Sequence, residues 1–98
     1  MKGRDRAALR AEAHHLKVLV HVGHSGLTPA LFSSLDDVLR THELVKAQVA
    51  QAGELSARDG ANQAAERLKA EVIQVIGRTF TLYRENPELK RGAEPPWR

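Results

Sequence analysis

The sequence has no cysteine, few aromatic residues and no long apolar run, and each shortage narrows the class of protein. Among its 98 residues there are 2 Phe, 1 Tyr, 1 Trp and 0 Cys. Without thiols there are no disulfides, no thiolate zinc site and no cysteine nucleophile. No apolar run approaches the roughly 20 residues that span a bilayer, and the basic N-terminus lacks the apolar core of a signal peptide. We therefore expect a cytoplasmic protein with no membrane partner.

The residues that are present fit one small globular domain. The content is 42% hydrophobic and 28% charged, which is typical of a folded soluble chain. Net charge is +3, and the ends are more basic than the middle: residues 1–27 carry five Lys or Arg against two acids, 36–71 five against seven, and 72–98 five against three. If the ends meet, they form a basic face suited to a polyanion. A solvated surface without function explains the asymmetry equally well.

Hydrophobic periodicity predicts helices that alternate with short strands and a final hairpin. In chain order the expected elements are a helix over 5–15, a strand over 17–22, a helix over 29–42, a strand over 43–50, a helix over 57–68, and strands over 72–76 and 79–84. This α-β-α-β-α-β-β order predicts an α/β fold, a single domain with a four-stranded mixed sheet. We expect the domain to cover 1–87, followed by a flexible, proline-rich tail over 88–98 that holds Trp97.

Three local signals support the expected elements. Thr28 and Pro29 stand where an N-cap and a first helical residue belong. Alanines on one face of the third helix would let it lie close to a sheet, and Gly77-Arg78 fits a type II′ hairpin turn.

The most distinctive local feature is the loop Gly23-His24-Ser25-Gly26, between a strand and a capped helix. Two glycines permit close approach of another backbone, and exposed N–H groups at a helix start favour a phosphate. The KH module holds nucleic-acid backbone on such a GxxG loop. A plain strand-to-helix turn is the alternative, since two glycines at this spacing are common.

Basic residues around this loop could add to such a site, and other chemistries find less support. The candidates are Arg10, Lys17, Lys46, Arg78 and Arg84. Scarce aromatics argue against a base-stacking platform, so backbone recognition is favoured. The histidines show no standard metal-ligand spacing. Ser25 has His21 and His24 nearby, but there is no Gly-x-Ser-x-Gly, P-loop or dinucleotide motif. We expect no enzyme, no cofactor, no metal and no small-molecule substrate.

Five segments together resemble the YhbY family, the stand-alone bacterial form of the CRM (chloroplast RNA splicing and ribosome maturation) domain. They follow the order and spacing of that family over about residues 5–87. The segments are Ala13-His14-His15-Leu16-Lys17, Val22-Gly23-His24-Ser25-Gly26-Leu27-Thr28, His42-Glu43-Leu44-Val45-Lys46, Val75-Ile76-Gly77-Arg78-Thr79 and Leu82-Tyr83-Arg84.

The resemblance implies a fold similar to the C-terminal domain of translation initiation factor 3. It also implies RNA binding by the GxxG loop and nearby basic residues, and association with precursors of the large ribosomal subunit during ribosome assembly. The implied RNA-binding residues are Lys17, Gly23, His24, Ser25, Gly26, Lys46, Arg78 and Arg84. A module that docks a partner protein through its basic face is the alternative.

Three positions depart from the family pattern. His24 stands where the family usually has Lys or Asn, which is expected to weaken phosphate binding above neutral pH. Val18 replaces a common proline. The glycine-containing turn that usually precedes the third strand is missing around Lys69-Ala70-Glu71.

Overall fold

A computed structural model describes residues 3–51, 53–86 and 88 of the chain. In chain order its elements are α1 (Gly3–Ala13), β1 (Val18–Val22), α2 (Pro29–His42), β2 (Leu44–Val49), α3 (Ala57–Leu68), β3 (Glu71–Ile76) and β4 (Thr79–Tyr83). The predicted α/β class, element order and four-stranded mixed sheet are confirmed. The largest shift in a boundary is at α1, which lies two residues N-terminal to the expected range.

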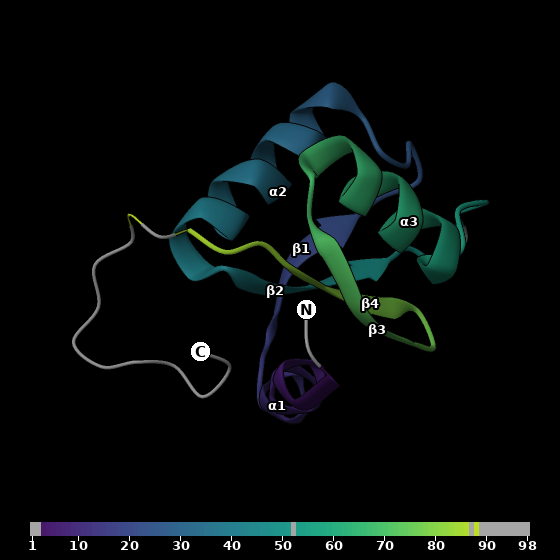
Figure 1. The fold of residues 1–98 in the computed structure, drawn as a ribbon. Coiled ribbons are helices and arrows are strands. Elements are labelled where there is room, and N and C mark those ends of the chain that lie inside the picture. The colour runs from purple at the N-terminus through teal and green to yellow at the C-terminus, as the bar shows by residue number, and fades with distance from the viewer. Residues whose placement is uncertain (1–2, 52, 87, 89–98) are drawn as a thin grey trace.

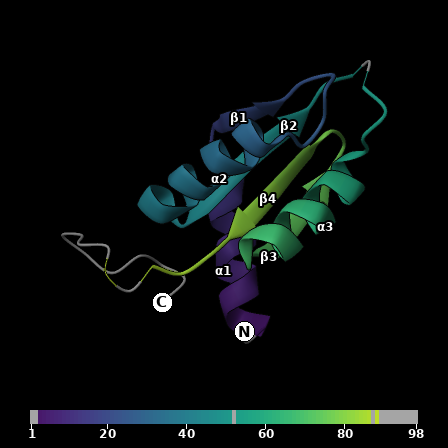
Figure 2. The ribbon, with the colours of Figure 1, turned by 90° about the horizontal axis from the view of Figure 1, so that it is seen from above.

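The sheet has the strand order β1-β2-β4-β3. β1 and β2 are parallel and are joined by α2, whereas β4 is antiparallel to both of its neighbours, β2 and β3. Helices α2 and α3 lie side by side over one face of the sheet, and α1 lies under the other face (Figures 1 and 2). The chain therefore forms a central sheet with a full helical layer on one side and a partial layer on the other.

Each of the two edge strands contains one extra residue relative to its neighbour. In β1 the pairing passes from Val18 to Val20 while β2 advances by one residue, so Leu19 is the additional residue. In β3 the same shift occurs around Ile73. Both irregularities are β-bulges, which increase the local twist of the strand that carries them.

The main core lies between the sheet and the α2–α3 layer. It includes Leu35 and Leu39 of α2, with Phe80 and Leu82 of β4, and all four side chains are at most 1% exposed. The helix predicted over 29–42 and the strand predicted over 79–84 therefore both contribute to this core.

A smaller core lies on the opposite face, under α1. Leu9 of α1 packs with Leu44, Ile73 and Tyr83 at the ends of three strands. Arg6 adds a hydrogen bond to the Val72 carbonyl at 3.1 Å. Because these contacts involve only one end of the sheet, no helix in the described part of the chain covers the remainder of this face (Figure 1).

The predicted N-cap at Thr28 is present, and Ser56 caps α3 in the same way. The Thr28 and Ser56 hydroxyls accept hydrogen bonds from the backbone N–H groups of Leu31 and Asp59, at the starts of α2 and α3. Gly77 has a φ of 58° while Arg78 keeps a negative φ, which fits the predicted type II′ turn. Lys69 ends α3 in the left-handed conformation, with a φ of 56°, and so occupies the position where a glycine is usual.

The predicted C-terminal tail, 88–98, lies outside the described residues except for Glu88, and Trp97 lies outside them as well. The proposed boundary between domain and tail stays a prediction.

Candidate functional site

One end of the sheet gathers the features that the sequence singled out. β1 and β2 both end there, and the β3–β4 hairpin turns there (Figure 2). The Ala50 N–H donates to the Val22 carbonyl at 2.8 Å, and the Val49 N–H donates to the Arg78 carbonyl at 2.9 Å. These two bonds join the strand ends to the hairpin, so Gly23 and Arg78 are held near each other although 55 positions separate them in the sequence.

The GxxG loop closes on itself and points its backbone outwards. The Gly26 N–H donates to the Gly23 carbonyl at 3.0 Å, and Gly26 has a φ of 70°, a conformation that strains any L side chain. A Cβ added at either glycine would have no atom within 4 Å apart from those of its chain neighbours, and His24 and Ser25 are exposed. Within the described residues, no hydrogen bond occupies the N–H of His24 or Ser25. The loop thus presents backbone donors just ahead of the α2 N-terminus.

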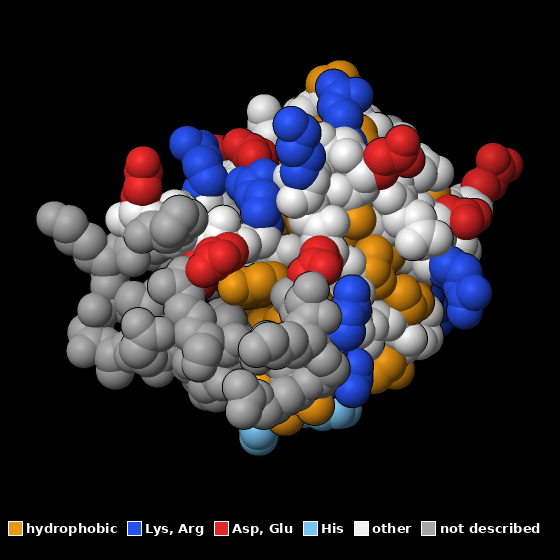
Figure 3. Space-filling model, viewed as in Figure 1, with side chains coloured by type: hydrophobic (Ala, Val, Ile, Leu, Met, Phe, Trp, Pro, Cys, Tyr) orange, Lys and Arg blue, Asp and Glu red, His pale blue; other side chains and the backbone are white. Residues whose placement is uncertain are grey.

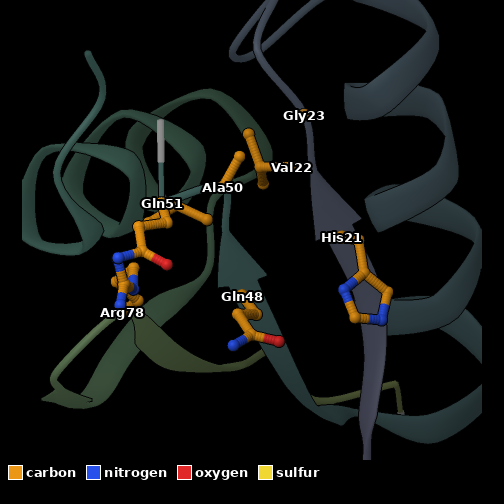
Figure 4. A pocket seen from close by; sticks show the side chains of 8 residues that line it. His21, Val22, Gly23, Gln48, Ala50, Gln51 and Arg78 are labelled. Carbon is orange, nitrogen blue, oxygen red and sulfur yellow. The ribbon is translucent and has the colours of Figure 1, made fainter. Parts of the chain in front are cut away.

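A cavity of about 310 Å³ adjoins this loop. Its polar side chains come from three elements: His21 from β1, Gln48 and Gln51 from β2 and the turn after it, and Arg78 from the hairpin (Figure 4). Gly23 lies at its edge, and the Gln51 and Arg78 side chains lie next to each other on the side opposite His21 (Figure 4). The cavity therefore lies between the GxxG loop and the β3–β4 hairpin turn.

A second hollow, of about 490 Å³, lies on the other side of the loop. His24, Ser25 and Gly26 line it together with Gly53, Glu54 and Leu55 of the β2–α3 connection. The Glu54 carboxylate makes this side of the loop less favourable to an anion than the side that faces Arg78.

The uncovered face of the sheet leads away from the cavity. Side chains alternate along β2, so Gln48 and Lys46 lie on the same face as Leu44, which packs under α1. His21 pairs with Gln48 and shares this face. Lys46 is half-buried there, one pleat further from the loop than Gln48.

Lys17 lies at the far end of β1. It is exposed and precedes Val18, which is the pairing partner of Lys46. Lys17 is six positions before Gly23, which is roughly 20 Å of extended chain at about 3.3 Å per residue. Lys17 and Lys46 therefore lie near each other but apart from the loop.

Arg84 is on the other side of the sheet, where it contacts the helical layer. Its guanidinium donates to the Leu68 carbonyl at 2.9 Å and to the Asp36 carbonyl at 3.2 Å. It also forms an ion pair with the Asp36 carboxylate at 2.9 Å, and its side chain is only 22% exposed. The structure thus brings together the GxxG loop and Arg78, places Lys46 further along the open face and Lys17 at the far end of β1, and sets Arg84 apart.

On the face seen in Figure 3, the charged side chains of the described residues do not form one continuous patch. On the side seen in Figure 3, Lys and Arg side chains occur in separate groups with acidic side chains between them. In the described part of the chain, no group of three or more His, Asp or Glu side chains could hold a metal ion. None of the helices that the structure describes is long and apolar enough to cross a membrane.

Sequence reasoning missed Gln48 and Gln51 and placed His21 only among weak metal and hydrolase candidates. Alternation along β2 could have put Gln48 on the same face as Lys46. No local signal marks Gln51, because its place beside Arg78 depends on how the hairpin packs against the end of β2.

Comparison with known proteins identifies the family of the chain. The model of the CRS1/YhbY (CRM) domain family matches residues 1–84. "Probable RNA-binding protein YqeI" of Bacillus subtilis is 31% identical over 91 residues, covering 93% of this chain and 95% of that protein. An "RNA-binding protein" of Haemophilus influenzae is 33% identical over 87 residues, covering 89% and 88% of the two chains.

A solved structure has the same fold. It is the solution structure of the "hypothetical protein SAV1595 from Staphylococcus aureus, a putative RNA binding protein". The two chains superpose with a TM-score of 0.77 at 30% identity, over 92% of this chain and 94% of the other.

The fold and the loop at its strand ends define a small α/β domain with a GxxG surface. This chain belongs to the CRS1/YhbY (CRM) domain family.

Proposed function

We propose that this protein binds RNA by holding the phosphate backbone on the Gly23–Gly26 loop beside Arg78. The observation that carries the proposal is the meeting of an exposed, donor-rich loop with an arginine from a distant hairpin at one end of the sheet. Relatives of similar length are named as RNA-binding proteins, which supports RNA as the polyanion.

The loop and the basic side chains have different tasks in this proposal. The free N–H groups of His24 and Ser25 donate to phosphate oxygens, aided by the positive end of α2. Arg78 is exposed, and its planar guanidinium can donate two parallel hydrogen bonds to one phosphate. Lys46 and Lys17 neutralise phosphates further along the open face. The mechanism is binding, with no chemical step.

Arg84 is the one predicted residue that we leave out of this surface. Its guanidinium is directed to the Leu68 and Asp36 carbonyls and to the Asp36 carboxylate, so capture of a phosphate would require these bonds to break.

Precursor RNA of the large ribosomal subunit is the target that we propose, with the protein acting during ribosome assembly in the cytoplasm. The family resemblance supports this target. Fractionation of a bacterial lysate on a sucrose gradient tests it: the protein should peak at or just below the large subunit and leave that position after mild ribonuclease treatment. Recovery only at the top of a low-salt gradient would reject the ribosomal target.

Two variants of Gly26 test the role of the loop. Gly26→Asp and Gly26→Asn have side chains of similar size, and both residues tolerate a positive φ better than most. Only the aspartate adds a negative charge beside the phosphates. We expect Gly26→Asp to weaken RNA binding at least about tenfold, about 1.4 kcal/mol, and Gly26→Asn to weaken it much less. Fluorescence anisotropy measures the affinity, and circular dichroism confirms that both variants fold.

An apolar docking surface is the second candidate, and one observation favours it. Ile76 is 53% exposed on β3, beside the open face of the sheet. Salt separates the two functions. RNA affinity should fall linearly with the logarithm of salt concentration through counterion release, whereas a largely apolar protein interface should change little. Two results would reject the proposed site. One is an RNA affinity that does not change with salt concentration, and the other is an unchanged RNA affinity of a folded Gly26→Asp variant.

A further inference from the structure

The cavity beside the GxxG loop has a lining that phosphate binding does not explain. A phosphate group needs only donors, yet two of the four polar side chains, Gln48 and Gln51, end in carboxamides that donate and accept. A volume of about 310 Å³ is at the low end of the roughly 300–1,000 Å³ of pockets that take one small molecule. The cavity therefore suits a single group with hydrogen-bonding edges of both kinds.

A nucleobase has such edges, and the side chains present match those of a purine. A glutamine carboxamide pairs with N6 and N7 of adenine, and an arginine pairs with O6 and N7 of guanine. The uracil ring lacks the N7 acceptor that both pairings use. A histidine ring can stack on a base, and so can the plane of a guanidinium. His21 and Arg78 lie on opposite sides of the cavity, with Gln48 on the strand between them (Figure 4).

The base must be unpaired to reach these side chains. In A-form RNA the major groove is deep and narrow, and side chains cannot read the base edges there. Gln48 lies on β2 and Arg78 lies in the two-residue turn between β3 and β4. A base turned out of a helix or a base in a single-stranded segment can enter the cavity.

We infer that this cavity is a subsite for one unpaired purine base of an RNA whose backbone lies on the adjacent GxxG loop. The inference rests on the proposed function and extends it from backbone capture to selection of a nucleotide. Gly23 belongs to both surfaces, so a nucleotide whose phosphate contacts the loop would have its base directed toward Gln48 and Gln51. The open face beyond Gln48 leads to Lys46, where the next phosphates would be neutralised.

Binding to oligoadenylate and oligouridylate of equal length tests the inference. The wild-type protein should bind oligoadenylate about tenfold more tightly, since one good purine contact contributes roughly 1–3 kcal/mol of discrimination. A blunt duplex of the same length should bind more weakly than oligoadenylate. The variant Gln48→Ala/Gln51→Ala should bind both single strands with nearly equal affinity and keep the salt dependence of the wild type, because the loop and Arg78 are unchanged.

Gln63→Ala is the matched control. Gln63 is exposed on α3, away from the cavity, and its loss should leave the preference for oligoadenylate intact. The single variant Gln51→Ala is the second test, because Gln51 is exposed in a connection outside the strands and its replacement should leave the fold intact. It should reduce the preference for oligoadenylate over oligouridylate in part.

The two ideas fail in different ways. Equal affinity of the wild type for both single strands, or a preference that survives Gln48→Ala/Gln51→Ala, overturns the base subsite while RNA binding stands. Absence of binding to any RNA at low salt overturns both. Tighter binding of the duplex would also overturn the subsite and assign the site to helical RNA.

Discussion

Two arginines show how identical side chains acquire different roles. Arg78 and Arg84 flank the same strand, β4, and both match the family pattern. Arg78 is exposed at the rim of the cavity. Arg84 is 22% exposed and joins β4 to α2 and α3 through Asp36 and the Leu68 carbonyl at the end of α3. In the proposed function Arg78 therefore contacts RNA, whereas Arg84 stabilises the fold.

Alanine at each of these positions separates the two roles. Arg84→Ala should lower the free energy of unfolding by about 1–3 kcal/mol, because two backbone carbonyls lose a charged donor. Arg78→Ala should change stability by less than about 0.5 kcal/mol. Urea denaturation measures both, and RNA affinity should fall for Arg78→Ala. If Arg84→Ala kept full stability and lost RNA binding, the assignment would be reversed.

At the scale of the element, α3 is built to lie close to the sheet. Its buried residues are all small: Ala57, Gly60, Ala61 and Ala64. A Cβ added at Gly60 would come within 3.2 Å of the Leu55 side chain and 3.4 Å of the Phe80 ring. The helix therefore packs with little space to spare over β4, the strand that leads out of the Arg78 turn.

Enlarging this contact should separate the helix from the sheet. Ala61 is 0% exposed, and Ala61→Leu should destabilise the protein by about 1–3 kcal/mol through overpacking. Ala7→Leu is the control, because Ala7 is exposed on α1 and its enlargement should change stability by less than about 0.5 kcal/mol. Thermal or urea unfolding measures the difference; equal stability of the two variants would show that the α3 contact has room to spare.

At the scale of the whole molecule, the segment that follows β4 is bound to the end of α2. Glu43 is 0% exposed at the end of α2, and one of its carboxylate oxygens accepts the Asn86 N–H at 2.5 Å. The Asn86 side chain donates to the Arg40 carbonyl at 2.9 Å. The residues directly after β4 thus belong to the domain, and they are held against the C-terminal end of α2.

Two truncated proteins test the contribution of the Asn86 contacts to stability. A chain that ends at Arg84 loses the Asn86 hydrogen bonds to a buried carboxylate and to a helix end, so it should be about 1–3 kcal/mol less stable than the full chain. A chain that ends at Glu88 keeps them and should match the full chain. Chemical denaturation of the three proteins compares them. Equal stability of all three would place the end of the folded domain at Arg84.

Local signals in the sequence account for the elements that were predicted well. Thr28 and Pro29 mark the start of α2, its apolar spacing marks the buried face, and Gly77 marks the hairpin turn; each depends on neighbours within a few residues. The left-handed Lys69 was not foreseen, because any residue but glycine or asparagine is uncommon at that position.

The candidate site was predicted only in part, because it depends on contacts between distant segments. The GxxG loop is contiguous in sequence and was found. The cavity needs β1, β2 and the hairpin together, and the partner of Arg84 is 48 residues away, so neither leaves a local pattern. The basic residues could be listed from the sequence and matched to the family pattern, but neither step could say which of them the fold itself uses.

The two bulges on β1 and β3 bear on how the protein behaves at high local concentration. Several copies bound along one RNA would bring their exposed strand edges close together, and straight, flat edges can pair from molecule to molecule into aggregates. Here both outer strands carry an extra residue that disturbs the regular spacing of their outward N–H and C=O groups. Both margins of the sheet are therefore poorer templates for edge-to-edge association than straight strands would be.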